Sequence, residues 1–144
     1  MTLRTYLDTH RPTWREESDV DVLAWLQSPS GQYRETMITE RQLYARLGPA
    51  EAEAILQALE VVAASESPAA PVVKRALKWL APAEGGLDLG MAATRAMVVQ
   101  LQQAGALTKT QADAVLALAP PVLRCEGAGY PSVTARDLNA ARAR

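Results

Sequence analysis

Apolar residues recur at intervals of three and four along most of the chain, which is the spacing of one helix face. One such face follows Pro49 and consists of Ala52, Ile55, Leu59 and Val62. A second follows Met91 and consists of Thr94, Met97, Val98 and Leu101. The strict alternation typical of strands is almost absent. Residues 33–38 allow an extended segment, but no partner strand is evident.

Polar residues at the predicted helix starts form three capping boxes. In each box the threonine side chain accepts a hydrogen bond from the backbone amide three positions later, and the side chain at that position accepts one from the threonine amide. The pairs are Thr39 with Gln42, Thr108 with Gln111, and Thr134 with Asp137. An apolar residue stands directly before each threonine, and Ser18 is a further N-cap. Glycine and proline mark the breaks, at Gly48-Pro49, Gly105 and Pro120-Pro121.

These signals predict an all-α protein. We expect a single compact helical domain over residues 1–144, with about six or seven helices built from hairpins around residues 39–65 and 91–119. Phenylalanine is absent, so the expected large pieces of the core are Trp14, Trp25 and Trp79. Residues 1–16 form a candidate N-terminal arm, and residues 134–144 form a basic C-terminal helix.

Charge and cysteine content narrow the classes of function. The net charge of −1 gives no general basic field that would attract nucleic acid or an anionic membrane. A single cysteine, Cys125, allows no internal disulfide and fits a reducing compartment. The N-terminus lacks the apolar core of a signal peptide, and no apolar run approaches the roughly 18 residues that span a bilayer. We therefore expect a soluble protein that is cytoplasmic when synthesised.

The segment ITERQLYARLGPAEAEAILQALE, residues 38–60, has the layout of a DNA-reading helix-turn-helix. Its second helix, however, carries Glu51 and Glu53 where a reading helix needs cations, and it contains neither lysine nor arginine. Carboxylates at a helix N-terminus stabilise the helix dipole, whereas phosphate would repel them. We interpret the segment as two packed helices and do not expect a nucleic-acid partner.

No grouping of residues predicts an enzyme. His10 is the only histidine, and Cys125 has no histidine near it in sequence to form a nucleophile–base pair. The glycines at 84–90 and 127–129 match neither a dinucleotide fingerprint nor a P-loop. The carboxylates are scattered singly, and no Cys/His grouping has metal spacing. We expect no catalytic residue, no cofactor, no metal and no small-molecule substrate.

Basic residues gather in two places. Lys74, Arg75 and Lys78 fall on one side of a short helix, and arginines enrich residues 124–144. Each cluster is either an ordinary solvated face or a binding surface for an acidic protein or nucleic acid. No aromatic residue is interleaved with the C-terminal arginines, which argues against base stacking there.

The two ends of the chain are the predicted protein-binding segments, because a core formed by the chain itself explains them least. The residues are Leu3, Tyr6, Leu7 and Trp14 at the N-terminus, and Arg136, Arg142 and Arg144 at the C-terminus. Leu3, Tyr6 and Leu7 have the spacing of one side of a short amphipathic turn. That turn either folds back onto the chain's own core or docks, with the basic end, on a neighbouring subunit.

Four stretches resemble a group of small, mostly uncharacterised helical proteins encoded by tailed bacteriophages and prophages. They are WREESDVDVLAWLQSPS, ITERQLYARLGP, KWLAPAEGGLDLGMAATRAMVVQL and ALTKTQADAVLALA, and the likeness includes the ending VTARDLNAARAR. No catalytic or ligand motif is known to us for this group, so no residue role is carried over.

The resemblance implies a non-enzymatic virion structural or assembly protein of the tail or head–tail region. Its expected partners are other phage structural proteins or copies of itself, and its expected location is the host cytoplasm during synthesis and then the virion. A phage DNA-binding regulator and an inhibitor of a host protein are the alternative functions.

Overall fold

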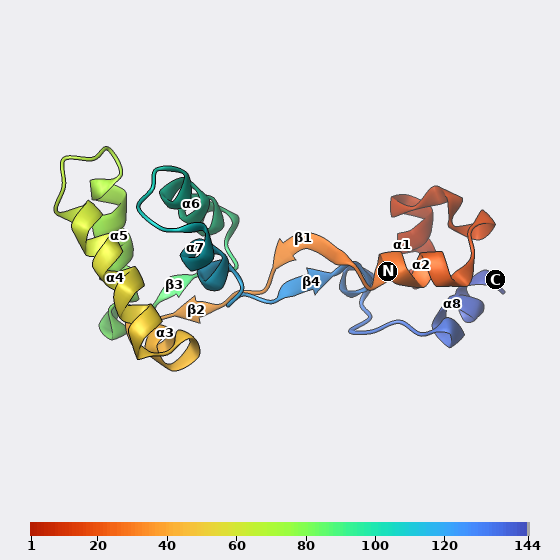
Figure 1. Cartoon of the computed structure of the whole chain (residues 1–144). Helices are drawn as coiled ribbons and strands as arrows, with labels where there is room; N and C mark the ends of the chain where they lie inside the picture. The colour runs from red at the N-terminus through yellow and green to blue at the C-terminus, as the bar shows by residue number, and fades with distance from the viewer. Residues whose placement is uncertain (144) are drawn as a thin grey trace. The chain divides into compact units, whose positions relative to one another are not determined.

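The computed structural model describes residues 1–143, which form two compact units (Figure 1). Both ends of the chain build the terminal unit, which contains residues 1–32 and the segment from Pro121 onwards. Residues 33–120 build the central unit. The expectation of a single domain differs from this division, because helix periodicity shows which face of a helix is buried but not which helices share a core.

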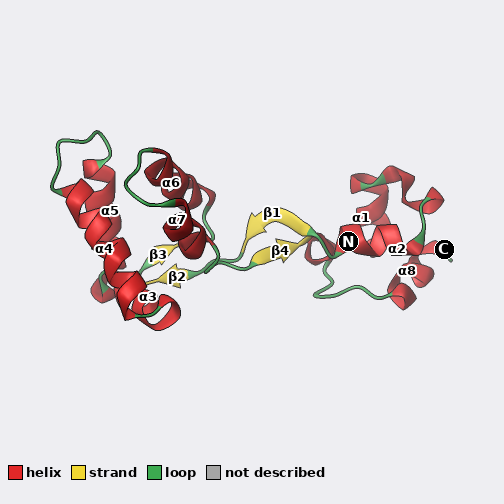
Figure 2. Cartoon of the chain, in the orientation of Figure 1, coloured by secondary structure: helices red, strands yellow, loops and turns green. Residues whose placement is uncertain are grey.

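Helices dominate both units, which confirms the prediction of a mainly helical protein (Figure 2). The all-α prediction is not met in full, since the described residues also contain four short strands: β1 (Pro29–Tyr33), β2 (Met37–Ile38), β3 (Leu87–Asp88) and β4 (Pro121–Leu123). Eight α-helices occur in the described chain, rather than six or seven. None of the described helices is long and apolar enough to cross a membrane.

The central unit contains five α-helices around the β2–β3 pair. They are α3 (Glu40–Leu47), α4 (Pro49–Ala63), α5 (Ala70–Leu80), α6 (Ala92–Gln103) and α7 (Lys109–Leu116), with the 3-10 helix η2 (Pro82–Glu84) after α5. Helix α4 packs against α3 and α5, and α6 packs against α7 (Figure 1). Gly48 joins α3 to α4 with a φ of 90°, a backbone conformation that favours glycine.

The partner of the extended segment near residue 38 comes from far along the chain. Strands β2 and β3 are antiparallel, with Ile38 opposite Leu87 and Met37 opposite Asp88. One carboxylate oxygen of Asp88 accepts hydrogen bonds at 2.9 Å from the amides of Thr36 and Gly90. A Cβ on Gly90 would lie 1.9 Å from the carbonyl oxygen of Arg34, so the close approach of the two backbones requires glycine.

All three predicted capping boxes are confirmed. The threonine side chain accepts a hydrogen bond from the N3 amide, and the N3 side chain accepts one from the threonine amide, at the starts of α3, α7 and α8 (Ala135–Arg142). Ser18 caps α2 (Asp19–Leu26), as predicted. Thr2 caps α1 (Leu3–His10) in the same way, so the N-terminus forms a complete helix rather than a single turn.

The terminal unit brings α1, α2 and α8 together with the 3-10 helices η1 (Pro12–Glu16) and η3 (Arg124–Ala128). Strands β1 and β4 pair with each other. Trp14 is fully buried here, as predicted, and Trp25 is partly buried at the edge of the same core.

Trp79 was expected in the core, and this prediction is wrong, because 44% of its surface is exposed. The buried face of α5 contains Val73, Ala76 and Leu80, at intervals of three and four residues. Trp79 directly precedes Leu80, so about 100° of helix rotation turns its indole ring away from that face.

Candidate functional site

The apolar residues predicted to bind a partner lie inside the terminal unit. Leu3, Tyr6, Leu7 and Trp14 are buried, and they share one core with Val22, Leu26, Leu138 and other apolar side chains. The N-terminal segment therefore folds back onto the chain's own core, which was one of the two alternatives. These side chains are not presented to a partner in this structure.

Arg142 acts within the same unit. Its guanidinium binds the carboxylate of Asp19 at 2.9 Å and donates hydrogen bonds to the carbonyl oxygens of Trp14, Arg15 and Glu17. It also lies 5.2 Å from the centre of the Trp14 ring. Arg142 thus fastens α8 to η1, to Glu17 and to the first residue of α2.

The other two predicted arginines are not brought into this arrangement. Arg136 is exposed on α8, and its side chain makes no hydrogen bond, ion pair or ring contact with another described residue. Arg144 lies outside the described residues. The structure therefore does not gather the seven predicted residues into one surface.

Further aromatic and charged groups stabilise the terminal unit. The guanidinium groups of Arg11 and Arg124 lie 5.2 Å and 4.8 Å from the centre of the Trp25 ring. A hydrogen bond from Arg11 lowers the pKa of Glu17, and one from the Trp14 indole lowers the pKa of Asp8. These charged side chains have partners inside the unit, which indicates a structural role.

His10 and Cys125, the two residues considered as nucleophile or base, do not form a catalytic pair. The ring of His10 stacks on Tyr6 at 4.3 Å, and its Nδ1 atom lies 3.0 Å from the Tyr6 carbonyl oxygen. Cys125 is fully buried, and that burial raises the pKa of its thiol. The thiol therefore stays protonated at neutral pH and is a poor nucleophile.

In the helix-turn-helix layout at α3 and α4, the second helix, α4, presents carboxylates and carries no cation. The Tyr44 hydroxyl on α3 donates a hydrogen bond to the Glu53 carboxylate on α4, and Gln57 donates a second one to it. The interaction with Glu53 raises the pKa of Tyr44. Glu53 thus ties the two helices together at the position where a reading helix would meet DNA.

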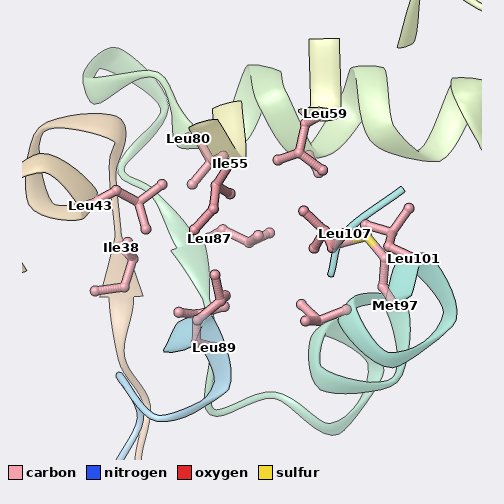
Figure 3. A pocket seen from close by; sticks show the side chains of 13 residues that line it. Ile38, Leu43, Ile55, Leu59, Leu80, Leu87, Leu89, Met97, Leu101 and Leu107 are labelled. Atoms are coloured by element: carbon pink, nitrogen blue, oxygen red, sulfur yellow. The ribbon is translucent and has the colours of Figure 1, made fainter. Parts of the chain in front are cut away.

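An apolar cavity of about 40 Å³ lies in the core of the central unit (Figure 3). Its lining comes from α3 to α7, the β2–β3 pair and the following loops: Ile38, Leu43, Ile55, Leu59, Ala76, Leu80, Leu87, Leu89, Met97, Val98, Leu101, Leu107 and Val115. The volume exceeds that needed by one water molecule, but these side chains offer water no hydrogen-bond partner. We interpret the cavity as a packing void.

The outer face of α5 is the candidate binding site. Lys74, Arg75, Lys78 and Trp79 are all exposed, and with Pro71 they line a surface hollow of about 350 Å³. The opposite face of the helix is buried against the central unit. We call the five residues that line the hollow the α5 face.

The cations of the α5 face lack ion-pair partners within the described part of the chain. In contrast, Arg11, Arg15, Lys109 and Arg142 each pair with a carboxylate. The charges of the α5 face are therefore available to a partner, and an exposed indole ring lies beside them.

Sequence reasoning found the three cations of this face but missed Trp79. The signal was present, because Trp79 falls outside the stripe formed by Val73, Ala76 and Leu80. Placing each residue of α5 by its angle around the helix would have separated Trp79 from the buried positions.

Among the described residues, no three His, Cys, Asp or Glu side chains gather as a metal site would require. Comparison of the chain with models of protein families, with curated protein sequences and with solved protein structures finds no match.

Proposed function

We propose that this protein is non-enzymatic and acts by binding other proteins, as a structural component or assembly factor of a tailed-phage particle. The observation that supports binding is the α5 face, where Trp79 is 44% exposed beside three cations without ion-pair partners in the described chain. Tryptophan and arginine are enriched among the residues that dominate binding energy at protein interfaces.

Burial of the exposed Trp79 indole ring is the expected source of binding free energy. Trp79 leaves roughly 100 Å² of mostly apolar surface in water, given the usual size of a tryptophan side chain. Covering that area would contribute about 2–3 kcal/mol at the usual coefficient for apolar burial. A contribution of this size changes an affinity by at most roughly a factor of 30 to 150, because the cost of ordering the interface offsets part of it.

The phage context of the proposal rests on the resemblance of the four sequence stretches. Within that context, the tail or head–tail region is the proposed location, and other structural proteins of the particle are the proposed partners. Binding by a helix face needs neither a cofactor nor a reactive side chain.

The test is complementation of a phage that lacks this gene. Trp79→Ala should reduce particle yield or incorporation of the chain at least about tenfold, because it removes a central interface side chain. Met91→Ala is the matched control, since Met91 is 54% exposed in the same unit but lies outside the α5 face. Mass spectrometry of purified particles and assembly intermediates measures incorporation, and circular dichroism verifies folding.

Full complementation by a folded Trp79→Ala variant would contradict the assignment of the α5 face. Absence of the wild-type chain from both particles and intermediates, with normal particle yield when the gene is deleted, would contradict a role in the virion.

A further inference from the structure

We infer that the α5 face binds a short acidic segment of a partner protein, which places two carboxylates on the cations and an apolar side chain on Trp79. The inference rests on the proposed function, and it specifies the chemistry of the partner at the same site. Its basis is the arrangement of charge and apolar surface along α5.

The α5 face consists of two neighbouring rows. Lys74 and Lys78 form one row, and Arg75 and Trp79 form the other, and the members of each row are four positions apart. Four residues correspond to about 6 Å along a helix, so each pair is separated by roughly one turn. The face from Pro71 to Trp79 extends over about 12 Å, which an extended segment of about four residues would match.

Each side chain of the α5 face suits one part of such a segment. The Arg75 guanidinium offers a carboxylate two parallel hydrogen bonds, and the ammonium groups of Lys74 and Lys78 attract a second carboxylate as point charges. Trp79 lies about one turn from Arg75 and supplies apolar surface to the hollow. Two carboxylates, one on Arg75 and one between Lys74 and Lys78, together with an apolar residue on Trp79 therefore complement the face.

The surroundings of the α5 face favour an acidic protein segment over nucleic acid. Exposed carboxylates occur at Glu66 and Glu84, near the two ends of α5. A nucleic-acid strand continuing past the hollow would bring phosphates toward these carboxylates, whereas a short peptide need not extend that far. Trp79 is also the one exposed aromatic residue of the central unit. Proteins that bind single-stranded nucleic acid without sequence preference stack successive bases on several aromatic rings, so one ring argues against this class of ligand.

The experiment uses the full chain labelled with ¹⁵N and follows the indole N–H signals of its tryptophans by NMR. The probe is a short synthetic peptide in which glutamates surround one leucine, and its counterpart carries glutamine in place of glutamate. Trp79→Phe identifies the Trp79 signal, and the signals of Trp14 and Trp25 in the terminal unit are internal references. We expect the acidic peptide to shift the Trp79 signal saturably and more weakly as salt increases.

A charge-reversal pair isolates the role of the cations. Lys74→Glu with Lys78→Glu should raise the dissociation constant for the acidic peptide at least about tenfold. Arg41→Glu with Arg136→Glu makes the same change in net charge at exposed positions outside the α5 face, and it should change the dissociation constant less than about threefold.

Three results would overturn the inference: no shift of the Trp79 signal with the acidic peptide, equal binding of the glutamine counterpart, or equal loss of affinity in both charge-reversed proteins. A shift produced by a single-stranded oligonucleotide and not by the acidic peptide would overturn it in favour of nucleic acid.

The two proposals fail in different ways. If Trp79→Ala blocks particle assembly while the acidic peptide does not bind, the proposed function stands and the acidic partner is wrong. If the acidic peptide binds through Trp79 and the cations while Trp79→Ala assembles normally, the ligand chemistry stands and the proposed function is wrong.

Discussion

At the scale of single residues, Arg142 holds the two ends of the chain together. It binds one carboxylate and three backbone carbonyl groups from residues 14–19. Because a guanidinium carries five donors in a fixed plane, one arginine can satisfy acceptors that an ammonium group cannot reach together.

Arg142→Ala should lower the free energy of unfolding of the terminal unit by about 2–3 kcal/mol, because several charge-assisted hydrogen bonds are lost. Arg142→Lys should restore only part of this loss. Arg136→Ala, at an exposed position on the same helix, should stay within about 0.5 kcal/mol of wild type. Urea unfolding measures the free energy of unfolding of all three variants. Equal stability of Arg142→Ala and wild type would contradict a structural role of Arg142.

Glu17 and Asp8 predict how the terminal unit responds to acid. The pKa of each carboxyl is lowered in the folded protein, chiefly by hydrogen bonds from Arg11 to Glu17 and from Trp14 to Asp8. The folded state therefore binds these protons less tightly than the unfolded chain does. The stabilisation is complete above the unfolded pKa values and is lost as pH falls through the lowered folded values.

We accordingly expect the urea midpoint of the terminal unit to hold steady near neutrality and to decrease below about pH 5. Glu17→Gln should be less stable than wild type at neutral pH and should show a smaller decrease on acidification. Tryptophan fluorescence at several pH values provides the measurement, and an unchanged pH dependence in Glu17→Gln would exclude this carboxyl as a contributor.

At the scale of elements, the central cavity shows where the helices pack imperfectly. Side chains from α4 and α5 meet those from α6 and α7 across the β2–β3 pair and leave about 40 Å³ unfilled (Figure 3). At about 24 cal/mol per Å³, a void of this size corresponds to roughly 1 kcal/mol of lost packing.

Val98→Ile should raise the free energy of unfolding of the central unit by up to about 1 kcal/mol, because the added methylene can enter the void. Leu101→Ala should lower it by about 3 kcal/mol, since it enlarges the same cavity. Val99→Ile is the matched control, as its side chain is 40% exposed on the same helix and should have little effect. Thermal unfolding tests the series, and destabilisation by Val98→Ile would show that the cavity cannot accept the extra group.

At the scale of the whole molecule, the chain builds one unit from a continuous segment and the other from its two ends. The central unit occupies residues 33–120 without interruption, and each unit has its own apolar core. A core that is complete within one continuous segment does not need the remaining chain in order to be buried.

A fragment of residues 33–120 should therefore fold alone, with helical circular dichroism and cooperative unfolding. A chain ending at residue 120 should retain the central unit but lose the terminal core, because Cys125, Val133 and Leu138 are missing from it. Proton NMR of both fragments shows whether the central unit is folded in each. An unfolded 33–120 fragment would show that the central unit depends on the ends of the chain.

Local signals determined where many helices begin and end. Thr39, Thr108 and Thr134 were identified correctly because a capping box depends on residues only three apart. The pairing of the extended segment at residues 33–38 was missed for the opposite reason. The partner of Ile38 is Leu87, and nothing in the residues around 38 indicates a pairing across that separation.

The sequence by itself determined a mainly helical chain, its principal helix starts and the cationic side of α5, because these follow from hydrogen bonds and periodicity within one helix. Tertiary structure alone decided that Leu3 and Leu7 are buried and that Arg142 pairs with Asp19. It also decided that Trp79 lies outside the core. The physical reason is that burial depends on which segments meet in space, and the terminal core joins residues more than 100 positions apart.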